Sequence, residues 1–435
     1  MHQSIVRRSL VVMAFYVVGH GFNYLLLVTS NRMLPPELFG LFYISLLLCN
    51  VLETLGFVLV MSMAQRFSGL AAAGGLDGVV VDLHRILRAV LKWGAVAALA
   101  AAAGLSVVGR FLGVESFAIV LLIPAVAFTE VLFEIIRAGF QALQRFAWFS
   151  ISWVIRCGVQ YVAAIMTFSL IGTVWAGMSG ILAATIAVCA IAWLALLPRK
   201  DRLRSAALAN PTPLLTREVV VPQLLAYGQF TLLVNLDVLL GYFLLSREQL
   251  GVYAASSILP KAIVTATLPV AQVLLPVVAS RSHAGESARL AIVKAVMAVL
   301  GLAIFGAAVL WLGGGIACGS RLGIRFCDLS LMTVLALAAI PLAMLRLLVV
   351  SNLALGAGNR PVLLTLGVVA FALIAALGAR GDVHHLAALY LAVSSGAMVL
   401  YLAADLVSGR WHVAKRAAQN AGEAPEPATR PARTG

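Results

Sequence analysis

The sequence predicts an all-α polytopic membrane protein of about twelve transmembrane helices, arranged as two six-helix lobes that are related as parallel repeats. Three observations support this class. Hydrophobic residues make up 62% of the 435 positions and charged residues only 11%, far outside the range of soluble globular proteins. About a dozen apolar stretches are long enough to cross a hydrocarbon core, and they lack the alternation of barrel strands. A segment near the N-terminus also recurs halfway along the chain.

The first copy of this repeat, residues 23–43, reads NYLLLVTSNRMLPPELFGLFY, and the second, residues 235–254, reads NLDVLLGYFLLSREQLGVYA. Each copy has an asparagine inside an apolar run and then a short polar turn. A glutamate, a glycine and an aromatic residue follow the turn in the same order. The corresponding residues are 211 positions apart: Glu37 and Glu248, Gly40 and Gly251, Phe42 and Tyr253. Such half-length repeats are typical of transporters that bind their substrate between two related bundles.

The apolar stretches follow one another through mostly short connections. They cover approximately residues 10–30, 38–64, 93–108, 117–140, 148–168, 173–197, 219–245, 252–279, 290–312, 329–354, 362–377 and 386–407. The first follows two arginines, as a signal peptide would. We count it as a span because its apolar run is too long and no small-residue cleavage site follows it.

The clearest break in the chain is a basic, proline-containing segment near its middle. It predicts a cytoplasmic linker at residues 198–218 between an N-lobe at residues 1–197 and a C-lobe at residues 219–410. Residues 411–435 are rich in alanine, proline, glutamate and arginine without periodicity, which predicts a disordered cytoplasmic tail.

Lysine and arginine are distributed unevenly between the two sets of connections. If the N-terminus is cytoplasmic, the outer side keeps only Arg32, Arg110, Arg247, Arg321, Arg325 and Arg380. This asymmetry predicts that both termini lie in the cytoplasm. It also explains most of the net charge of +14, so we expect contact with membrane lipids and no nucleic-acid partner.

Ionisable side chains inside the spans indicate function because they are costly there. Arg137, Arg156, Lys261 and Arg346 are the basic candidates for binding substrate in a cavity. Guanidinium groups suit a diphosphate because they offer several donors and keep their charge. An intrahelical ion pair with Glu134 is the alternative for Arg137, and extension to the cytoplasmic headgroups is the alternative for Arg156 and Arg346.

Two carboxylates are candidates for coupling transport to an ion or proton gradient, Asp237 first and Glu53 second. A lone carboxylate in a span can bind a cation or take up a proton. A salt bridge to Lys261 is the alternative for Asp237. Asn23 and Asn235 are candidates for hydrogen bonds to sugars, with interhelical hydrogen bonds as the alternative. We expect four candidates to converge on one central cavity: Arg156, Asp237, Lys261 and Arg346.

Other chemistry has little support in the sequence. There is no phosphate-binding loop of the P-loop pattern, so we expect no hydrolysis of ATP. The histidines do not have the spacing of metal ligands, so we expect no metal. We also expect no cofactor and no catalytic residues. Cys318 and Cys327 flank an outward connection, and the sequence leaves open whether they pair in an oxidising compartment.

Three turns of the chain resemble a known family. They are PPELFGLF after the first span, SREQLGVYAAS after the seventh and GAGNRP after the tenth. They are similar to the Wzx-type flippases of the multidrug/oligosaccharidyl-lipid/polysaccharide (MOP) exporter superfamily over residues 1–410. The resemblance implies a MATE-like fold that moves undecaprenyl-pyrophosphate-linked oligosaccharide between leaflets by cation-coupled alternating access. It also implies a place in the inner membrane of a bacterium and a role in exopolysaccharide, O-antigen or capsule synthesis, with a polymerase and glycosyltransferases as partners.

Two other functions stay open. A MATE-type cation-coupled multidrug exporter would have a cavity richer in acids and aromatic residues. The spans contain four basic and four acidic candidates, which does not decide the matter: Arg137, Arg156, Lys261 and Arg346 against Glu53, Glu130, Glu134 and Asp237. A membrane glycosyltransferase or polymerase would need a large outward loop, and the outward connections are short. We therefore expect a secondary transporter and not an enzyme.

Overall fold

The structure is a computed structural model that describes residues 2–72, 76–111, 117–143, 145–196, 217–268, 270–271, 274, 278, 289–318, 323–354, 361–378 and 382–407. Within these ranges the chain forms twelve helices and no strand, apart from one isolated bridge between Cys318 and Ile324. The helices are α1 (His2–Met33), α2 (Pro36–Ala72), α3 (Leu76–Phe111), α4 (Phe117–Ala142), α5 (Phe146–Ile171), α6 (Val174–Leu196), α8 (Arg217–Leu244), α9 (Arg247–Ala266), α11 (Arg289–Ala317), α12 (Leu329–Ala354), α13 (Pro361–Gly378) and α14 (Val383–Val407). The predicted all-α class is confirmed.

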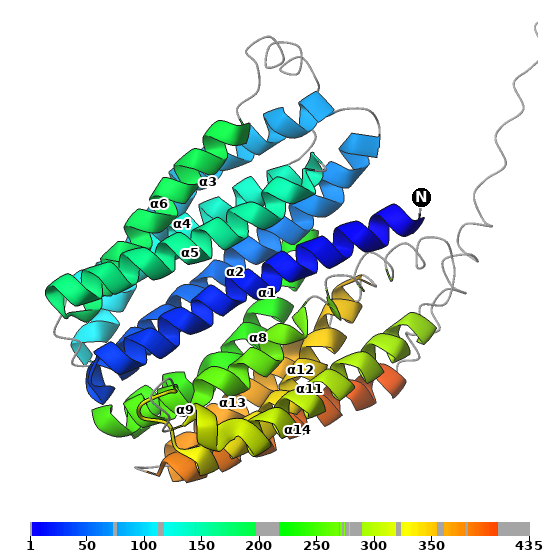
Figure 1. Cartoon of the computed structure of the whole chain (residues 1–435). Coiled ribbons are helices and arrows are strands. Elements are labelled where there is room, and N and C mark those ends of the chain that lie inside the picture. Colours follow the sequence, from blue (N-terminus) through cyan, green and yellow to red (C-terminus); the bar gives the residue numbers. More distant parts are fainter. Residues whose placement is uncertain are drawn as a thin grey trace, which may run out of the picture.

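Nine helices of the described part are long and apolar enough to cross a membrane. They are α2, α3, α4, α5, α6, α8, α11, α12 and α14. Large apolar side chains such as Leu170, Trp311 and Leu312 are exposed on their outer faces. Apolar surface of this extent is unfavourable in water and favourable against lipid. The chain is therefore a multi-pass membrane protein, and α1, α9 and α13 run beside the nine spans in Figure 1.

The helices pack in two groups that follow the order of the chain (Figure 1). In the first half, α4 contacts α2, α3, α5 and α6, and α1 packs along α5. In the second half, α12 contacts α8, α9, α11 and α14, and α13 packs against α8 and α14. Helix α2 contacts α4 of its own half and α8 and α9 of the other, so it joins the two halves.

The two copies of the repeat meet at one end of the bundle. A Cβ added to Gly40 in α2 would lie 3.1 Å from the amide nitrogen of Gly251 in α9. A Cβ added to Gly251 would lie 2.8 Å from the Cα of Pro36 and closer still to the Pro36 carbonyl group. The two backbones therefore touch, which small residues permit and larger ones prevent. We call Pro36, Gly40 and Gly251 the repeat-turn contact.

The polar turns of the repeat start the helices that make this contact. Helix α2 begins at Pro36, the first helical position, where a missing N–H costs no hydrogen bond. Helix α9 begins with a capping box: the Ser246 hydroxyl accepts from the Gln249 N–H at 3.2 Å, and the Gln249 side chain accepts from the Ser246 N–H at 3.0 Å. Just beyond the contact, the Ser257 hydroxyl donates to the Tyr43 hydroxyl at 3.2 Å, joining α9 to α2.

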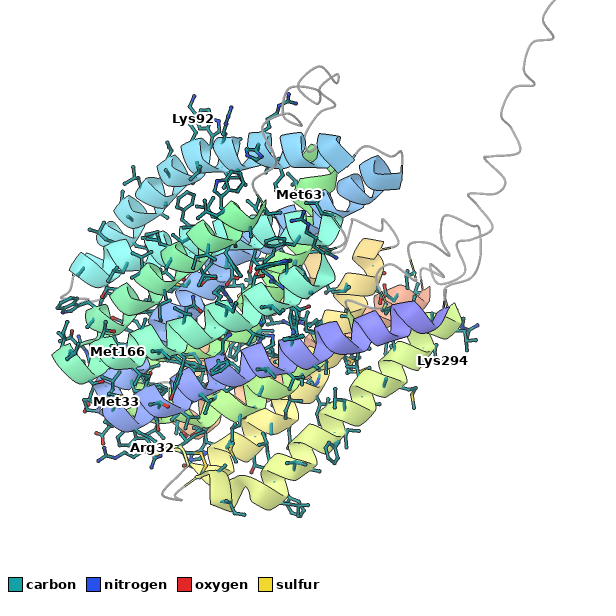
Figure 2. The ribbon with its side chains drawn as sticks, turned by 45° about the horizontal axis from the view of Figure 1, so that its top comes forward. Arg32, Met33, Met63, Lys92, Met166 and Lys294 are labelled. Carbon is teal, nitrogen blue, oxygen red and sulfur yellow. A yellow bond between two sulfur atoms is a disulfide. The ribbon has the colours of Figure 1, made fainter. Side chains whose placement is uncertain are left out.

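The connection between α11 and α12 lies at the same end of the bundle. It contains a disulfide between Cys318 and Cys327, so the pairing that the sequence left open is present in the structure. The Asn31 side chain accepts a hydrogen bond of 2.6 Å from the backbone N–H of Arg325, which ties this connection to the end of α1. Figure 2 shows Arg32 and Met33 at this end of the molecule and Lys294 at the opposite end.

The predicted domain boundaries fall mostly on residues that the structure does not describe. Of the linker at residues 198–218 only the last two positions are described, and they belong to α8. The tail at residues 411–435 lies wholly outside the described ranges. These boundaries stay predictions.

Candidate functional site

The ionisable side chains inside the helices form two groups, one in each half. In the first group, Glu130 of α4 forms a salt bridge with Arg156 of α5. Gln160 donates to the same carboxylate at 2.5 Å and to the Thr185 hydroxyl of α6 at 2.7 Å. Arg156 is only 4% exposed, so it does not extend to a headgroup region. The polar partners offset the cost of burying both charges and tie three helices together.

Arg137 and Glu134 form a second ion pair of the first half. Nη1 of Arg137 donates to both carboxylate oxygens of Glu134, at 2.6 and 2.7 Å, and Nε donates to the Phe149 carbonyl at 3.3 Å. The two residues are three positions apart on α4, where side chains lie on the same helical face. The intrahelical ion pair, which the sequence left as the alternative for Arg137, is therefore present.

Trp153 lies between the two arginines of this group. Its ring centroid is 4.7 Å from Cζ of Arg137 and 4.2 Å from Cζ of Arg156, which is a favourable cation–π distance. Tyr16 of α1 stacks on the same ring at 5.4 Å, and His20 meets its edge at 5.5 Å. Helix α1 is thus held against two neutralised ion pairs through aromatic contacts.

The second group is centred on Asp237 of α8, whose side chain is fully buried. Oδ1 of Asp237 accepts from Nζ of Lys261 in α9 at 3.0 Å. Oδ2 accepts from the Tyr253 hydroxyl at 3.4 Å, a longer contact. The structure therefore has the salt bridge that the sequence left as the alternative for Asp237, and the coupling role of this carboxylate stays a prediction.

A small cavity of about 10 Å³ borders this pair, with room for about one water molecule. Ser257 and Tyr390 line it together with Asp237 and Lys261. The remaining lining residues are Pro260, Val264, Leu335, Ala339 and Leu342. Nζ of Lys261 is also 6.0 Å from the ring centroid of Tyr43 in α2, so the pair lies close to the junction of the two halves.

Arg346 of α12 differs from the other basic candidates. Its Nη1 donates to the Val264 carbonyl at 3.0 Å, its guanidinium lies 5.4 Å from the Phe230 ring, and the Tyr227 hydroxyl contacts it. Nε is buried without a hydrogen-bond partner. No carboxylate among the described residues forms a salt bridge with Arg346, whereas each of the other three basic candidates has one. Among the described residues its positive charge therefore lacks a counter-ion, and we call this charge uncompensated.

The other predicted site residues have varied surroundings. Glu53 of α2 is half-buried and has no salt bridge within the described ranges. Asn23 of α1 is half-buried. Asn235 is 4% exposed, and its side-chain amide donates to the Thr231 carbonyl of its own helix at 2.9 Å. This donor of Asn235 therefore serves α8 itself.

The four residues expected to converge lie in two places. Asp237 and Lys261 form one pair, and Arg346 bonds to Val264, which lines the cavity beside that pair. Arg156 lies in the other half, where Glu130 neutralises it. The structure thus brings Asp237 and Lys261 together and places Arg346 next to the cavity wall at Val264, while Arg156 lies apart from this pair.

We did not predict a fourth buried carboxylate of the described residues, Asp405 of α14, which is 1% exposed. The Asn352 amide of α12 donates to both of its oxygens at 3.0 Å and to the Tyr401 hydroxyl at 3.2 Å. Its position inside the twelfth apolar stretch is the signal that would have identified it. In the described part of the chain no group of three or more His, Cys, Asp or Glu residues could hold a metal ion.

No protein-family model and no curated protein matches the sequence. Solved structures do resemble the chain. A MATE transporter in complex with MaL6 has a TM-score of 0.70 and 15% identity, over 95% of this chain and 96% of its own. The eukaryotic MATE transporter AtDTX14 has a TM-score of 0.68 and 15% identity, over 96% and 98%. A MOP superfamily transporter from Pyrococcus furiosus has a TM-score of 0.68 and 14% identity, over 95% and 96%. The chain is therefore a multi-pass membrane protein with the fold of the MATE transporters of the MOP superfamily.

Proposed function

We propose that the chain is a secondary transporter that moves a lipid-linked, diphosphate-bearing oligosaccharide between the leaflets of a bacterial inner membrane, as Wzx-type flippases do. Both termini would face the cytoplasm. The substrate class that we favour is undecaprenyl-pyrophosphate glycan, with the polymerase and glycosyltransferases of the same pathway as partners.

The uncompensated charge of Arg346 carries this proposal. Arg346 is half-buried, and a partly desolvated cation without a counter-ion is unfavourable; a carbonyl oxygen such as that of Val264 does not neutralise it. An anionic ligand would supply the missing charge. The planar guanidinium fits phosphate oxygens through paired hydrogen bonds, and its Nε has no other partner. The bond to Val264 places Arg346 against α9, and α9 packs against α2 of the other half, so the charge lies near the junction of the halves.

The paired intramembrane charges support the same assignment because they cancel. Glu130 balances Arg156, Glu134 balances Arg137, and Asp237 balances Lys261. These pairs add little net charge to the region between the halves. Two other charged candidates of the second half are Arg346, which bonds to Val264 of the cavity wall, and Asp405, whose two oxygens accept from Asn352. The positive charge next to the cavity wall is therefore that of Arg346.

A cation-coupled multidrug exporter is the second candidate, and Glu53 is the observation that favours it. This half-buried carboxylate has no salt bridge among the described residues and would attract a cationic compound on the first-half side. For the Pyrococcus furiosus transporter, reverse polarity of the binding pocket is taken to suggest a different function. We infer that pocket polarity separates the two candidates here as well.

The test is a deletion strain assayed for surface glycan and for lipid-linked precursor. We expect surface glycan to disappear while the linked precursor accumulates in the inner leaflet. Arg346→Met should fail to restore export although it reaches the membrane, and Arg346→Lys should restore part of it. Lys294→Met removes an exposed charge at the end of the bundle opposite to the repeat-turn contact, and this variant should restore export fully.

The opposite result assigns the protein to the second candidate. If glycan is unchanged and the strain becomes sensitive to cationic dyes, the flippase proposal is wrong. Glu53→Gln should then abolish dye resistance, and Arg346→Met should leave it intact.

A further inference from the structure

We infer that Lys261 is a built-in cation: its ammonium group occupies the place beside Asp237 that a monovalent metal ion would otherwise take. Removal of the Lys261 side chain should therefore create a sodium site. If the chain transports as proposed above, its transport cycle needs no metal ion at Asp237; this consequence rests on the proposed function.

The Asp237 carboxylate is fully buried, and an ionised carboxylate away from water needs a compensating charge. Lys261 supplies that charge at 3.0 Å from Oδ1. The only other contact shown for the carboxylate is the neutral Tyr253 hydroxyl at 3.4 Å, which cannot balance it. Without the ammonium group, the site would favour another cation.

Oxygen-bearing side chains lie near the ammonium group. Asp237, Ser257 and Tyr390 border the same small cavity as Lys261, which has room for about one water molecule. The Ser257 and Tyr390 hydroxyls each donate to a backbone carbonyl at 2.8 Å, which leaves lone pairs on both oxygens. Oxygen ligands of this kind suit hard cations. The one carboxylate that pairs with Lys261 gives a single negative charge, which a single monovalent ion balances. The chemistry therefore indicates a monovalent ion.

The ammonium group is covalently attached to the chain. A metal ion can leave and rebind, whereas Nζ of Lys261 can only move on its side chain. Nζ lies 6.0 Å from the Tyr43 ring, and Tyr43 accepts a hydrogen bond from Ser257 of the same cavity wall. The fixed charge thus stays attached to α9 and lies beside the junction of the halves.

The test measures the melting temperature of the purified full-length protein in NaCl, KCl and choline chloride at equal ionic strength. The wild type should melt at the same temperature in all three salts. Lys261→Ala, which removes the charge and leaves space, should show a saturable, sodium-dependent rise on the order of 5 °C, as expected when ligand reaches about 100-fold its Kd. Lys261→Met, which fills the space, and Asp237→Asn/Lys261→Ala, which removes the carboxylate, should show no such rise.

Three results would overturn the inference. One is sodium-specific stabilisation of the wild type that Asp237→Asn abolishes. Another is a Lys261→Ala protein that folds but responds equally to all three cations. The third is a Lys261→Ala protein that responds to pH and not to sodium, since a proton would then replace the ammonium group.

If Lys261→Ala does not fold, the binding of radioactive sodium to the wild type and to Asp237→Asn is measured instead. Absence of Asp237-dependent binding supports the inference, and its presence contradicts it. None of these measurements needs transport, so failure of the inference and failure of the flippase proposal can be told apart.

Discussion

A methyl group at position 251 tests whether the two halves separate at the repeat-turn contact. Gly251→Ala places a Cβ against the backbone of Pro36, which cannot move aside as a flexible side chain can. Overpacking of this kind costs about 1–3 kcal/mol. The cost applies only while α2 and α9 touch, because alanine is at least as favourable as glycine in a free helix. The population with these helices apart should therefore rise by about 5- to 150-fold, at about 1.4 kcal/mol per tenfold.

The assay is the reaction rate of a cysteine at position 257 with a maleimide. Ser257 is fully buried beside Tyr43, so Ser257→Cys should react only when α9 leaves α2. The three free cysteines are first replaced by alanine: Cys49, Cys157 and Cys189. Gly228→Ala is the matched control because open space surrounds Gly228 in α8. If Gly251→Ala leaves the rate unchanged in a folded protein, or if Gly228→Ala raises it equally, the halves do not separate here.

Three further predictions concern stability in detergent. Arg156→Met should lower the free energy of unfolding by about 3–5 kcal/mol because Glu130 stays buried without its counter-ion. The double variant Glu130→Gln/Arg156→Met should recover most of this loss. Equal losses in the single and double variants would show that the two residues do not stabilise the fold as a pair. Asp328→Ala should lower the free energy of unfolding by about 1 kcal/mol. The Asp328 side chain caps α12 by accepting from the N–H groups of Ser330 and Leu331 at 2.8 and 3.1 Å. Asp328→Asn keeps an acceptor oxygen and should lower the free energy of unfolding much less. Partial burial raises the pKa of Asp328, but these hydrogen bonds outweigh it and hold the pKa below its ordinary value of 3.8. The ionised form therefore adds stability above pH 3.8, and this contribution disappears as the pH falls through the lowered pKa; a melting curve between pH 6 and 3 should show the loss in the wild type and not in Asp328→Asn.

The number and type of the helices could be predicted from the sequence because lipid requires each crossing to be a long apolar helix. Helix ends were less predictable. The third apolar stretch covers residues 93–108, whereas α3 extends over Leu76–Phe111. Hydropathy reports the part of a helix that suits hydrocarbon, and a helix can continue into polar surroundings with the same backbone hydrogen bonds.

The candidate site was predictable where the partners share one helix. The three-residue spacing of Glu134 and Arg137 indicated their ion pair. The partners Glu130 and Arg156 lie on different helices, and their meeting depends on how α4 and α5 rotate about their axes. A single sequence indicates how deep a residue lies in the membrane but not the direction in which its helix turns it. For that reason the uncompensated charge of Arg346 emerged only from the structure.

The meeting of Glu130 and Arg156 also restricts how this sequence can change over time. Loss of either residue alone leaves a buried, unpaired charge, so a descendant with one substitution would be selected against. A sequence in which both residues have become uncharged has no unpaired charge and avoids this cost. In homologous sequences, positions 130 and 156 should therefore be either both charged or both neutral. Proteins in which the two positions vary together should keep this packing of α4 against α5.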